Sequence, residues 1–197
     1  MTDKETLRVY DAKAAEYAKL IKRENNDDPH LDRFINKLPT GGRVLDLGCG
    51  PGISAACMAN AGLQVDAIDG SAEMIAMATQ HQGVTAWQAT FDEITGTNIY
   101  DGIWANFCLL HASKEAVPQH LAALVTALKL GGAFHIAMKL GSGSQRDTIG
   151  RLYSYYSEPE LTNLLVAAGL TVAETAHGRT VGLDGTEADW IVMAACG

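Results

Sequence analysis

Long hydrophobic runs, paired cysteines and an excess of basic residues are all missing from this 197-residue sequence. No apolar run approaches the roughly 20 residues that a helix needs to cross a bilayer, and the polar segment 1–8 lacks the apolar core of a signal peptide. We therefore expect a cytoplasmic protein with no membrane partner. Lys and Arg number 15 against 23 Asp and Glu, for a formal net charge of −8. This balance disfavours nucleic acid as a partner, because binding a polyanion needs a basic face.

Cysteine is scarce, and its spacing is uninformative for metal binding. The four cysteines are Cys49, Cys57, Cys108 and Cys196. They form no CxxC or other zinc-like pair, so no metal site is expected. Cysteine in apolar stretches usually behaves as a small buried hydrophobe, and we expect reduced thiols. Cys49 differs from the others because it lies inside a glycine-rich turn.

Charged residues make up only 19% of the chain, whereas hydrophobic residues make up 47%, enough for a sizeable core. Such a composition is typical of a folded protein rather than of a disordered one. We expect one domain over residues 1–197. Within it, 1–38 forms a helical cap and 43–197 forms an α/β core.

Apolar periodicity divides the chain into helices and strands. In the cap, apolar residues recur at helical spacing through 7–21 and again through 30–38, with a break at 25–29. In the core, expected strands alternate with expected helices, which predicts a mainly parallel sheet covered on both faces. The expected strands are 43–47, 64–68, 84–89, 102–107, 133–138, 170–175 and 190–195, and the expected helices are 53–61, 71–80, 114–128 and 158–168. The last two strands have no helix between them, which favours an antiparallel edge hairpin, and the glycine- and serine-rich segment 141–150 is expected to be a loop.

A glycine-rich turn, D-L-G-C-G-P-G at 46–52, joins the first strand to the next helix. Glycines permit positive φ and let a ligand approach the backbone closely. The helix after the turn points its free N–H groups back at it. Since open α/β sheets bind ligands at the carboxyl ends of their strands, we expect the ligand site here.

Two ligand classes compete for this turn. Dinucleotide-binding turns typically have the sequence G-x-G-x-x-G/A, but here Ile53 stands at the last position of that pattern. Asp46 would repel a pyrophosphate, whereas it suits a ligand with an ammonium and a sulfonium. Asp69, at the end of the second strand, can accept hydrogen bonds from ribose hydroxyls of either ligand. A nicotinamide-dependent oxidoreductase therefore stays as the less favoured alternative.

The motif D-L-G-C-G-P-G resembles the first motif of class I S-adenosylmethionine-dependent methyltransferases, and the resemblance runs from Arg43 to the C-terminus. The two N-terminal helices also look like the cofactor-covering helices of that family. The resemblance implies a Rossmann-like, doubly wound, seven-stranded, mostly parallel sheet with helices on both faces. Its antiparallel C-terminal hairpin would place strand seven between strands five and six. The implied cofactor is S-adenosyl-L-methionine, which leaves as S-adenosyl-L-homocysteine.

The resemblance also implies cofactor contacts. Asp46 would orient the methionyl ammonium, Asp69 would accept from both ribose hydroxyls, and Asp92 would accept from the exocyclic amine of adenine. The other implied contacts are Gly48, Cys49, Gly50, Gly70, Ser71, Met74, Thr90, Phe91, Asn106, Phe107 and Leu109. Tyr17, on the first helix, either docks that helix or closes over the cofactor as a lid.

Residues for the methyl acceptor are harder to identify. His111 follows the fourth strand, where it is either a general base or substrate ligand or a hydrogen-bonded structural histidine. The first helix contributes Tyr10, two turns from Tyr17. A cluster follows the fifth strand, in a segment that helps shape the acceptor pocket in related enzymes: Arg146, Arg151, Tyr153, Tyr155 and Tyr156. Either arginine can bind an acceptor carboxylate bidentately, although a packing role is equally open.

Taken together, the sequence favours methyl transfer from S-adenosylmethionine to a small-molecule acceptor by in-line displacement. A compact acidic chain with no appended recognition domain motivates the small acceptor. The protein then mainly has to align the acceptor, carbon and sulfur, and it needs a base only if the nucleophile must lose a proton. A non-catalytic module that binds the same cofactor is the main alternative function.

Overall fold

A computed structural model describes residues 3–24 and 28–197 of the chain. Helix α1 (Lys4–Glu24) covers the first expected helix of the cap, and α2 (Pro29–Asn36) covers the second. The Asp28 side chain caps α2 by accepting a hydrogen bond of 2.9 Å from the backbone N–H of His30. The expected break at 25–29 lies mostly outside the described residues, since 25–27 are not among them.

The core is a seven-stranded sheet with the strand order β3-β2-β1-β4-β5-β9-β8. Its strands are β1 (Arg43–Leu47), β2 (Gln64–Asp69), β3 (Val84–Gln88), β4 (Tyr100–Asn106), β5 (Leu128–Lys139), β8 (Thr171–Val181) and β9 (Glu187–Cys196). Strands β1 to β5 pair in parallel, whereas β9 runs antiparallel to both β5 and β8. The last strand thus lies between the fifth and its own hairpin partner, as the resemblance implied.

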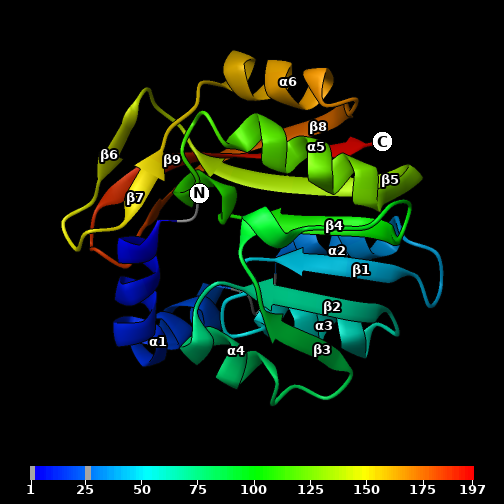
Figure 1. Cartoon of the computed structure of the whole chain (residues 1–197), viewed down its shortest axis with the longest axis horizontal. Coiled ribbons are helices and arrows are strands. Elements are labelled where there is room, and N and C mark those ends of the chain that lie inside the picture. The colour runs from blue at the N-terminus through cyan, green and yellow to red at the C-terminus, as the bar shows by residue number, and fades with distance from the viewer. Residues whose placement is uncertain (1–2, 25–27) are drawn as a thin grey trace.

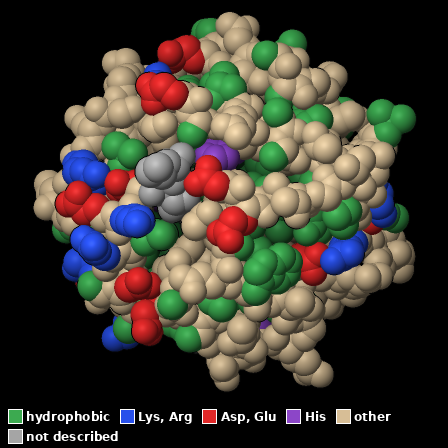
Figure 2. All heavy atoms as spheres, viewed as in Figure 1, with side chains coloured by type: hydrophobic (Ala, Val, Ile, Leu, Met, Phe, Trp, Pro, Cys, Tyr) green, Lys and Arg blue, Asp and Glu red, His purple; other side chains and the backbone are tan. Residues whose placement is uncertain are grey.

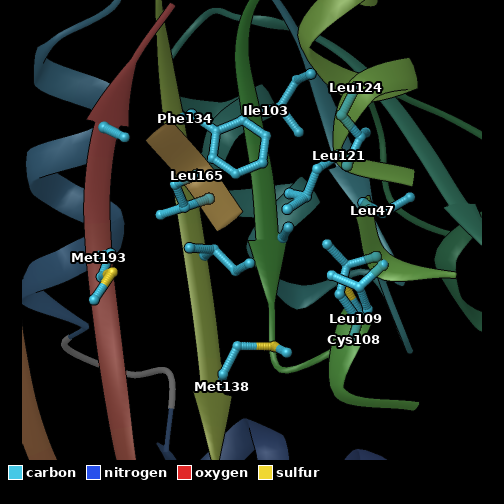
Figure 3. Close-up of a cluster of buried hydrophobic side chains, with 14 of the residues drawn as sticks. Leu47, Ile103, Cys108, Leu109, Leu121, Leu124, Phe134, Met138, Leu165 and Met193 are labelled. Carbon is cyan, nitrogen blue, oxygen red and sulfur yellow. The ribbon is translucent and has the colours of Figure 1, made fainter. Parts of the chain in front are cut away.

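Helices cover both faces of this sheet, which confirms the doubly wound prediction. The core helices are α3 (Ile53–Asn60), α4 (Ala72–Ala78), α5 (Val117–Ala127) and α6 (Glu158–Ala167). On one face, Ile103 and Phe134 pack against leucines of α5 and α6 (Figure 3). On the other face, Trp104 packs against Phe34 of α2, with ring centroids 5.2 Å apart. Successive residues of β4 therefore serve opposite cores, as expected for a strand buried on both sides.

Several expected boundaries differ from the structure. The helix expected at 114–128 ends at Ala127, and β5 begins at Leu128 rather than at 133 because the strand absorbs Gly131 and Gly132 at a register shift against β4. The segment expected as a loop carries a short strand, β6 (Ser144–Arg146), which pairs antiparallel with β7 (Leu152–Ser154). Strands β8 and β9 extend well beyond 170–175 and 190–195, so the polar connection between them is mostly an exposed hairpin.

Helix α1 stands at the sheet end to which β1 and β4 point, beside the β6–β7 hairpin (Figure 1). Its Asp11 carboxylate accepts a hydrogen bond of 2.5 Å from the Ser71 hydroxyl at the start of α4. Its Thr6 hydroxyl accepts one of 2.8 Å from the backbone N–H of Leu152 in β7. These contacts hold α1 across the carboxyl edge, while α2 covers a sheet face. In the described part of the chain, helices of a length and apolarity suited to crossing a bilayer are absent.

Candidate functional site

The glycine turn has the conformation that its sequence predicts. Gly48, Gly50 and Gly52 have φ values of 63°, 54° and 79°, in the left-handed region that favours glycine. A Cβ on Gly48 would overlap the Cβ of Cys108, so the backbone itself approaches the loop after β4. Gly52 then serves as the N-cap of α3. The backbone N–H of Cys49 donates to the carbonyl of Ile68 at 2.9 Å, and that of Gly52 donates to the carbonyl of Cys49 at 3.0 Å, so the turn is held against the end of β2.

Asp69 ends β2 beside this turn. One of its carboxylate oxygens accepts from the backbone N–H of Gly50 at 2.9 Å, and the other accepts from that of Ser71 at 2.8 Å. Burial raises the pKa of Asp69, and the two N–H donors oppose that rise. Each oxygen retains acceptor capacity, so the fixed carboxylate can receive two further hydroxyl groups.

Asp69 lines a cavity, here called the Asp69 cavity, beneath α1. Most of the residues that the resemblance assigned to the cofactor line it: Tyr17, Gly48, Gly50, Asp69, Gly70, Met74, Thr90, Phe91, Asn106 and Phe107. Tyr10 and His111 line it too. Sequence reasoning missed three further lining residues at the N-terminal end, namely Asp3 just before α1 and Thr6 and Leu7 in its first turn. The helical repeat of Leu7 was visible, but nothing in the sequence showed that this turn of the helix faces the strand ends.

Asp46 lines an adjoining cavity, here called the Asp46 cavity, together with Cys49 and the turn glycines. Its side chain is only 2% exposed, and its Oδ2 atom has no hydrogen-bond partner among the described residues. Burial and, next, the charge of Asp69 raise the pKa of Asp46 to about 7, although the backbone N–H of Ala55 opposes the rise. An unpaired buried carboxylate is unfavourable, so a cationic ligand group beside it would be strongly held. The site therefore fits an ammonium.

A third cavity, the Lys139 cavity, is also bordered by α1, through Tyr10, Tyr17, Leu20 and Ile21. Its aromatic lining comes from Tyr10, Tyr17, Phe107, Tyr153 and Trp190, and its charged lining comes from Lys139 and Arg151. The sequence did not single out Lys139, Trp190 or the tip of the β8–β9 hairpin at 180–183. Lys139 could have been predicted as a site residue, because it directly follows the expected fifth strand. Residues in the same position after the other strands were taken as site candidates.

Two residues join all three cavities. Tyr17 and Phe107 line each of them, so the three spaces meet around these rings. Phe107 follows β4 with a φ of 52°, which is rare for a residue with a side chain. Its backbone N–H donates to the carbonyl of Ala137 at 3.1 Å, which holds the strained residue in place. Backbone strain of this kind gathers at functional sites, where the surrounding structure sustains it.

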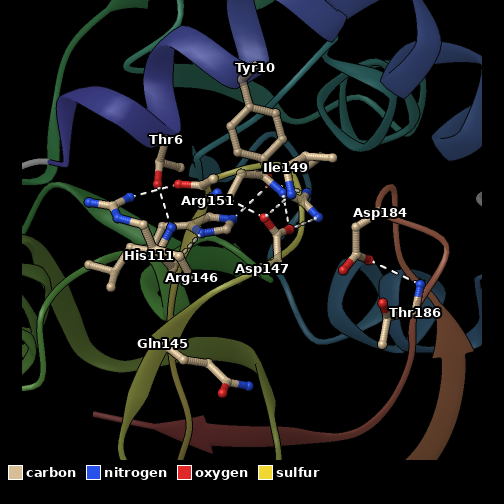
Figure 4. Close-up of polar contacts among 12 residues, drawn as sticks. Thr6, Tyr10, His111, Gln145, Arg146, Asp147, Ile149, Arg151, Asp184 and Thr186 are labelled. Atoms are coloured by element: carbon tan, nitrogen blue, oxygen red, sulfur yellow. Dashed lines mark hydrogen bonds and ion pairs between the residues drawn. The ribbon is translucent and has the colours of Figure 1, made fainter.

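His111 and Tyr10 belong to one buried polar chain (Figure 4). The Nδ1 atom of His111 lies 2.6 Å from the carbonyl of Leu152, which can only accept, so Nδ1 carries the proton. Its Nε2 atom then accepts from the Tyr10 hydroxyl at 2.7 Å. Arg151 donates to the same hydroxyl at 3.1 Å and pairs with Asp147 at 2.8 Å. Burial lowers the pKa of His111 to about 3, which favours the structural alternative over a general base.

Several expected site residues lie outside the three cavities. Ser71 is fully buried and caps α4, so it fixes Asp69 from behind through its N–H. Leu109 is in the core, Asp92 is exposed on the 3₁₀ turn Phe91–Glu93, and Tyr156 packs under Lys114. The guanidinium of Arg146 is occupied by Asp3, at 2.9 Å, and therefore ties β6 to α1 instead of facing an acceptor.

Cys49 lies within the glycine turn and lines the Asp46 cavity. Burial raises the pKa of the Cys49 thiol, so this side chain stays protonated beside the turn. All four cysteines are free. Within 3–24 and 28–197, no group of three or more His, Cys, Asp or Glu side chains is placed to hold a metal ion.

The fold and these carboxylates define a class of protein: an α/β domain that binds a ligand at the carboxyl edge of a doubly wound sheet. Comparison with known proteins shows which members of this class the chain resembles. A family model described as a methyltransferase domain matches residues 44–132. The chain is 25% identical to 1,6-didemethyltoxoflavin-N1-methyltransferase from Burkholderia thailandensis, whose crystal structure holds 1,6-didemethyltoxoflavin and S-adenosylhomocysteine. The two structures superpose with a TM-score of 0.79, over 98% of this chain and 87% of that one.

Two curated relatives are also methyltransferases by name. The cypemycin N-terminal methyltransferase of a Streptomyces species is 31% identical over 133 residues, which are 64% of this chain. This chain spans only 54% of that relative's length. An uncharacterized methyltransferase of Staphylococcus carnosus is 25% identical over 168 residues, covering 81% of this chain and 79% of the relative. Residues 44–132 thus match a methyltransferase domain, and the chain is similar over nearly its full length to a methyltransferase whose structure holds S-adenosylhomocysteine.

Proposed function

We propose that this chain transfers the methyl group of S-adenosylmethionine to a small-molecule acceptor, and that residues 1–197 act as one domain. The observation that carries the proposal is the unpartnered, buried Oδ2 atom of Asp46 beside the glycine turn. An ammonium satisfies this atom, whereas the pyrophosphate of a dinucleotide would be repelled by it. The residues present therefore fit S-adenosylmethionine.

The cavities suggest how the cofactor lies. In this proposal Asp69 receives the ribose hydroxyls, and Met74, Thr90 and Phe91 surround the adenine in the Asp69 cavity. The methionyl group then reaches Asp46 in the neighbouring cavity. When bound, S-adenosylmethionine supplies a methyl group already activated by its sulfonium. Tyr17 and Phe107, where all three cavities meet, would flank that methyl group.

The chain's own contribution is alignment and exclusion of water. Tyr17 and Phe107 would hold the acceptor in line, and well-oriented reactants can gain up to about 7–11 kcal/mol in this way. Helix α1 shields the reacting region from solvent, which protects the methyl donor from side reactions. Because neutral His111 already accepts from Tyr10, this proposal assigns no general base.

A small acceptor is supported by the Lys139 cavity, whose walls close in from α1, β7 and the β8–β9 hairpin. The Burkholderia relative is named for a small acceptor of this kind. Surface charge supports it as well. On the face shown in Figure 2, Lys and Arg near α1 alternate with Asp and Glu, rather than forming the basic patch that nucleic acid requires.

Calorimetry and turnover test the proposal together. We expect wild-type protein to bind S-adenosylhomocysteine with one-to-one stoichiometry and to show no heat with a nicotinamide dinucleotide. Turnover of labelled S-adenosylmethionine over a broad acceptor panel then separates an enzyme from a non-catalytic binding module. Absence of S-adenosylhomocysteine binding at millimolar concentration would refute the proposal.

A further inference from the structure

The acceptor's chemistry can be inferred from the Lys139 cavity, provided that the proposed function holds. Five of the residues that line it are aromatic, and no lining residue is an Asp or a Glu. Rings of Phe107 and Trp190 meet edge to face, with centroids 6.3 Å apart at 82°. Tyr10 and Tyr17 meet in the same way at 5.3 Å and 74°. Flat apolar walls of this kind favour a planar, aromatic ligand.

The charge inside this cavity comes from one side chain. Arg151 is 2% exposed and is neutralised by Asp147, to which its Nε donates at 2.8 Å. Lys139 has no carboxylate within ion-pair distance in the described parts of the chain. Its ammonium instead lies 4.0 Å from the centroid of the Tyr153 ring. The cavity therefore holds one cation that is not balanced by direct contact with an acid.

Nearby charged groups shift the pKa of Lys139 without forming an ion pair with its ammonium. Burial lowers the pKa of Lys139, and Arg151 lowers it further, whereas Asp184 and Asp147 raise it from a distance. Asp184 is held in the hairpin turn, where its carboxylate accepts from the backbone N–H of Thr186 at 3.2 Å (Figure 4). An anion entering the cavity would relieve the unfavourable burial of the charge on Lys139.

Trp190 forms one wall of the same space. The indole Nε1 of Trp190 is buried and has no hydrogen-bond partner among the described residues. Trp190 lines both the Lys139 cavity and the Asp46 cavity, so its ring stands between the acceptor space and the cofactor space. An ammonium without a carboxylate partner, set in an aromatic slot, favours a ligand that brings an acceptor group with it.

We propose that the Lys139 cavity takes a planar aromatic acceptor with an anionic group, and that the ammonium of Lys139 holds this group. A carboxylate, an ionised ring hydroxyl and an ionised ring nitrogen share this chemistry. Lys139 is the specificity-determining residue, and Trp190 is part of the aromatic wall against which the ring lies. The role differs from that of a base, because Lys139 keeps its proton throughout.

The test uses wild-type protein saturated with S-adenosylhomocysteine at pH 7.5. The probes are benzoate, salicylate, 2-naphthoate and quinoline-2-carboxylate, each paired with its neutral carboxamide, and affinity is measured by calorimetry. At least one carboxylate is expected to bind about tenfold more tightly than its carboxamide, since charge-assisted hydrogen bonds are roughly twice as strong as neutral ones. Cyclohexanecarboxylate, which is anionic but not planar, is expected to bind more weakly than benzoate.

Variants then test whether Lys139 causes the preference for carboxylates over carboxamides. Lys139→Met should remove it, weakening the carboxylate about tenfold and the carboxamide less than twofold, while Lys139→Arg should retain part of it. Lys114→Met is the matched control, because Lys114 also lies over a tyrosine ring, at 4.6 Å from Tyr156, but outside the cavity. It should leave every affinity unchanged.

The possible negative results distinguish failure of the proposed function from failure of the inference about the acceptor. If S-adenosylhomocysteine itself does not bind wild-type protein, the proposed function fails before the acceptor is tested. If it binds, the inference is overturned by equal affinities for carboxylates and carboxamides, by binding of no probe, or by a preference that survives Lys139→Met. It is also overturned if Lys139→Met abolishes turnover but leaves carboxylate affinity intact, since that result identifies Lys139 as a base.

Discussion

In the proposed site, we expect the buried carboxylate of Asp46 to make cofactor binding depend on pH, and the size of this effect can be calculated. In the free protein its pKa is raised to about 7, chiefly by burial. A bound ammonium favours the ionised carboxylate and must lower that pKa. Binding at pH 7 is therefore expected to release about half a proton from Asp46 to the buffer.

The magnitude follows from the fraction of Asp46 that is ionised. At pH 5, two pH units below its pKa, only about 1% of the carboxylate is charged, so the affinity for S-adenosylhomocysteine should fall up to about 100-fold relative to pH 8. Below pH 7 the logarithm of the association constant should rise by about one for each pH unit, and above pH 8 it should level off.

Calorimetry at pH 7 in two buffers of different ionisation enthalpy measures the released protons directly. Asp46→Asn is the decisive variant, because its amide is of similar size and does not titrate. We expect it to bind about 10- to 100-fold more weakly at pH 8 and to lose the pH dependence. A wild-type affinity that stays constant between pH 5 and pH 8 would refute the reasoning. A pH slope that persists in Asp46→Asn would place the titrating group elsewhere, with Asp69 the first candidate.

The same carboxylate predicts an effect on stability with the opposite sign. Because the pKa of Asp46 rises from 3.8 to about 7 on folding, the native state binds more protons than the unfolded state between these values, and stability falls as pH rises through that window. The difference corresponds to roughly 4 kcal/mol at pH 8. In the absence of cofactor, Asp46→Asn should therefore increase the free energy of unfolding at pH 8, measured in urea. An unchanged or reduced stability would contradict the raised pKa.

Three further substitutions test other parts of the site. Asp69→Ala should weaken S-adenosylhomocysteine binding by about 100-fold or more, since two hydroxyl hydrogen bonds to a charged group are lost, whereas Asp189→Ala, which removes an exposed partner of Arg179, should not. Tyr10→Phe should destabilise the fold by about 1–3 kcal/mol in urea unfolding, because Nε2 of His111 loses its donor and Arg151 an acceptor; no change would show that this chain of contacts contributes little. Gly48→Ala should lower the melting temperature and abolish cofactor binding, because its Cβ would overlap Cys108 at a positive φ; a variant with wild-type melting and affinity would contradict the predicted close approach.

The parts of the fold that the sequence predicted are those encoded locally. The strand, turn and helix at 43–60 rest on a buried apolar run, glycines at positive φ and a helical repeat, all within a few residues of one another. The pairing of β6 with β7 was missed because three-residue strands show no periodicity. The full length of β8 was missed because it is an edge strand, whose exposed face tolerates polar residues.

In the candidate site, too, the features encoded locally were predicted and those that depend on distant contacts were not. The closeness of Asp46 and Asp69 could be predicted because they lie at the ends of β1 and β2, and parallel topology brings these strand ends to one edge. The role of His111 was left open, since its partners Tyr10 and Leu152 are far from it in sequence and only the folded chain brings them together. Arg146 and Arg151 looked equivalent as sequence, yet one binds Asp3 at the surface and the other is buried against Asp147.

The proposed cofactor site can be tested by a crystal structure of the complex with S-adenosylhomocysteine. We expect the ligand's amino group at hydrogen-bond distance, about 3 Å, from Oδ2 of Asp46, with both ribose hydroxyls on Asp69. We also expect the sulfur atom to face the junction of the cavities between Tyr17 and Phe107. A ligand bound elsewhere, or one whose amino group avoids Asp46 while its ribose avoids Asp69, would contradict the account.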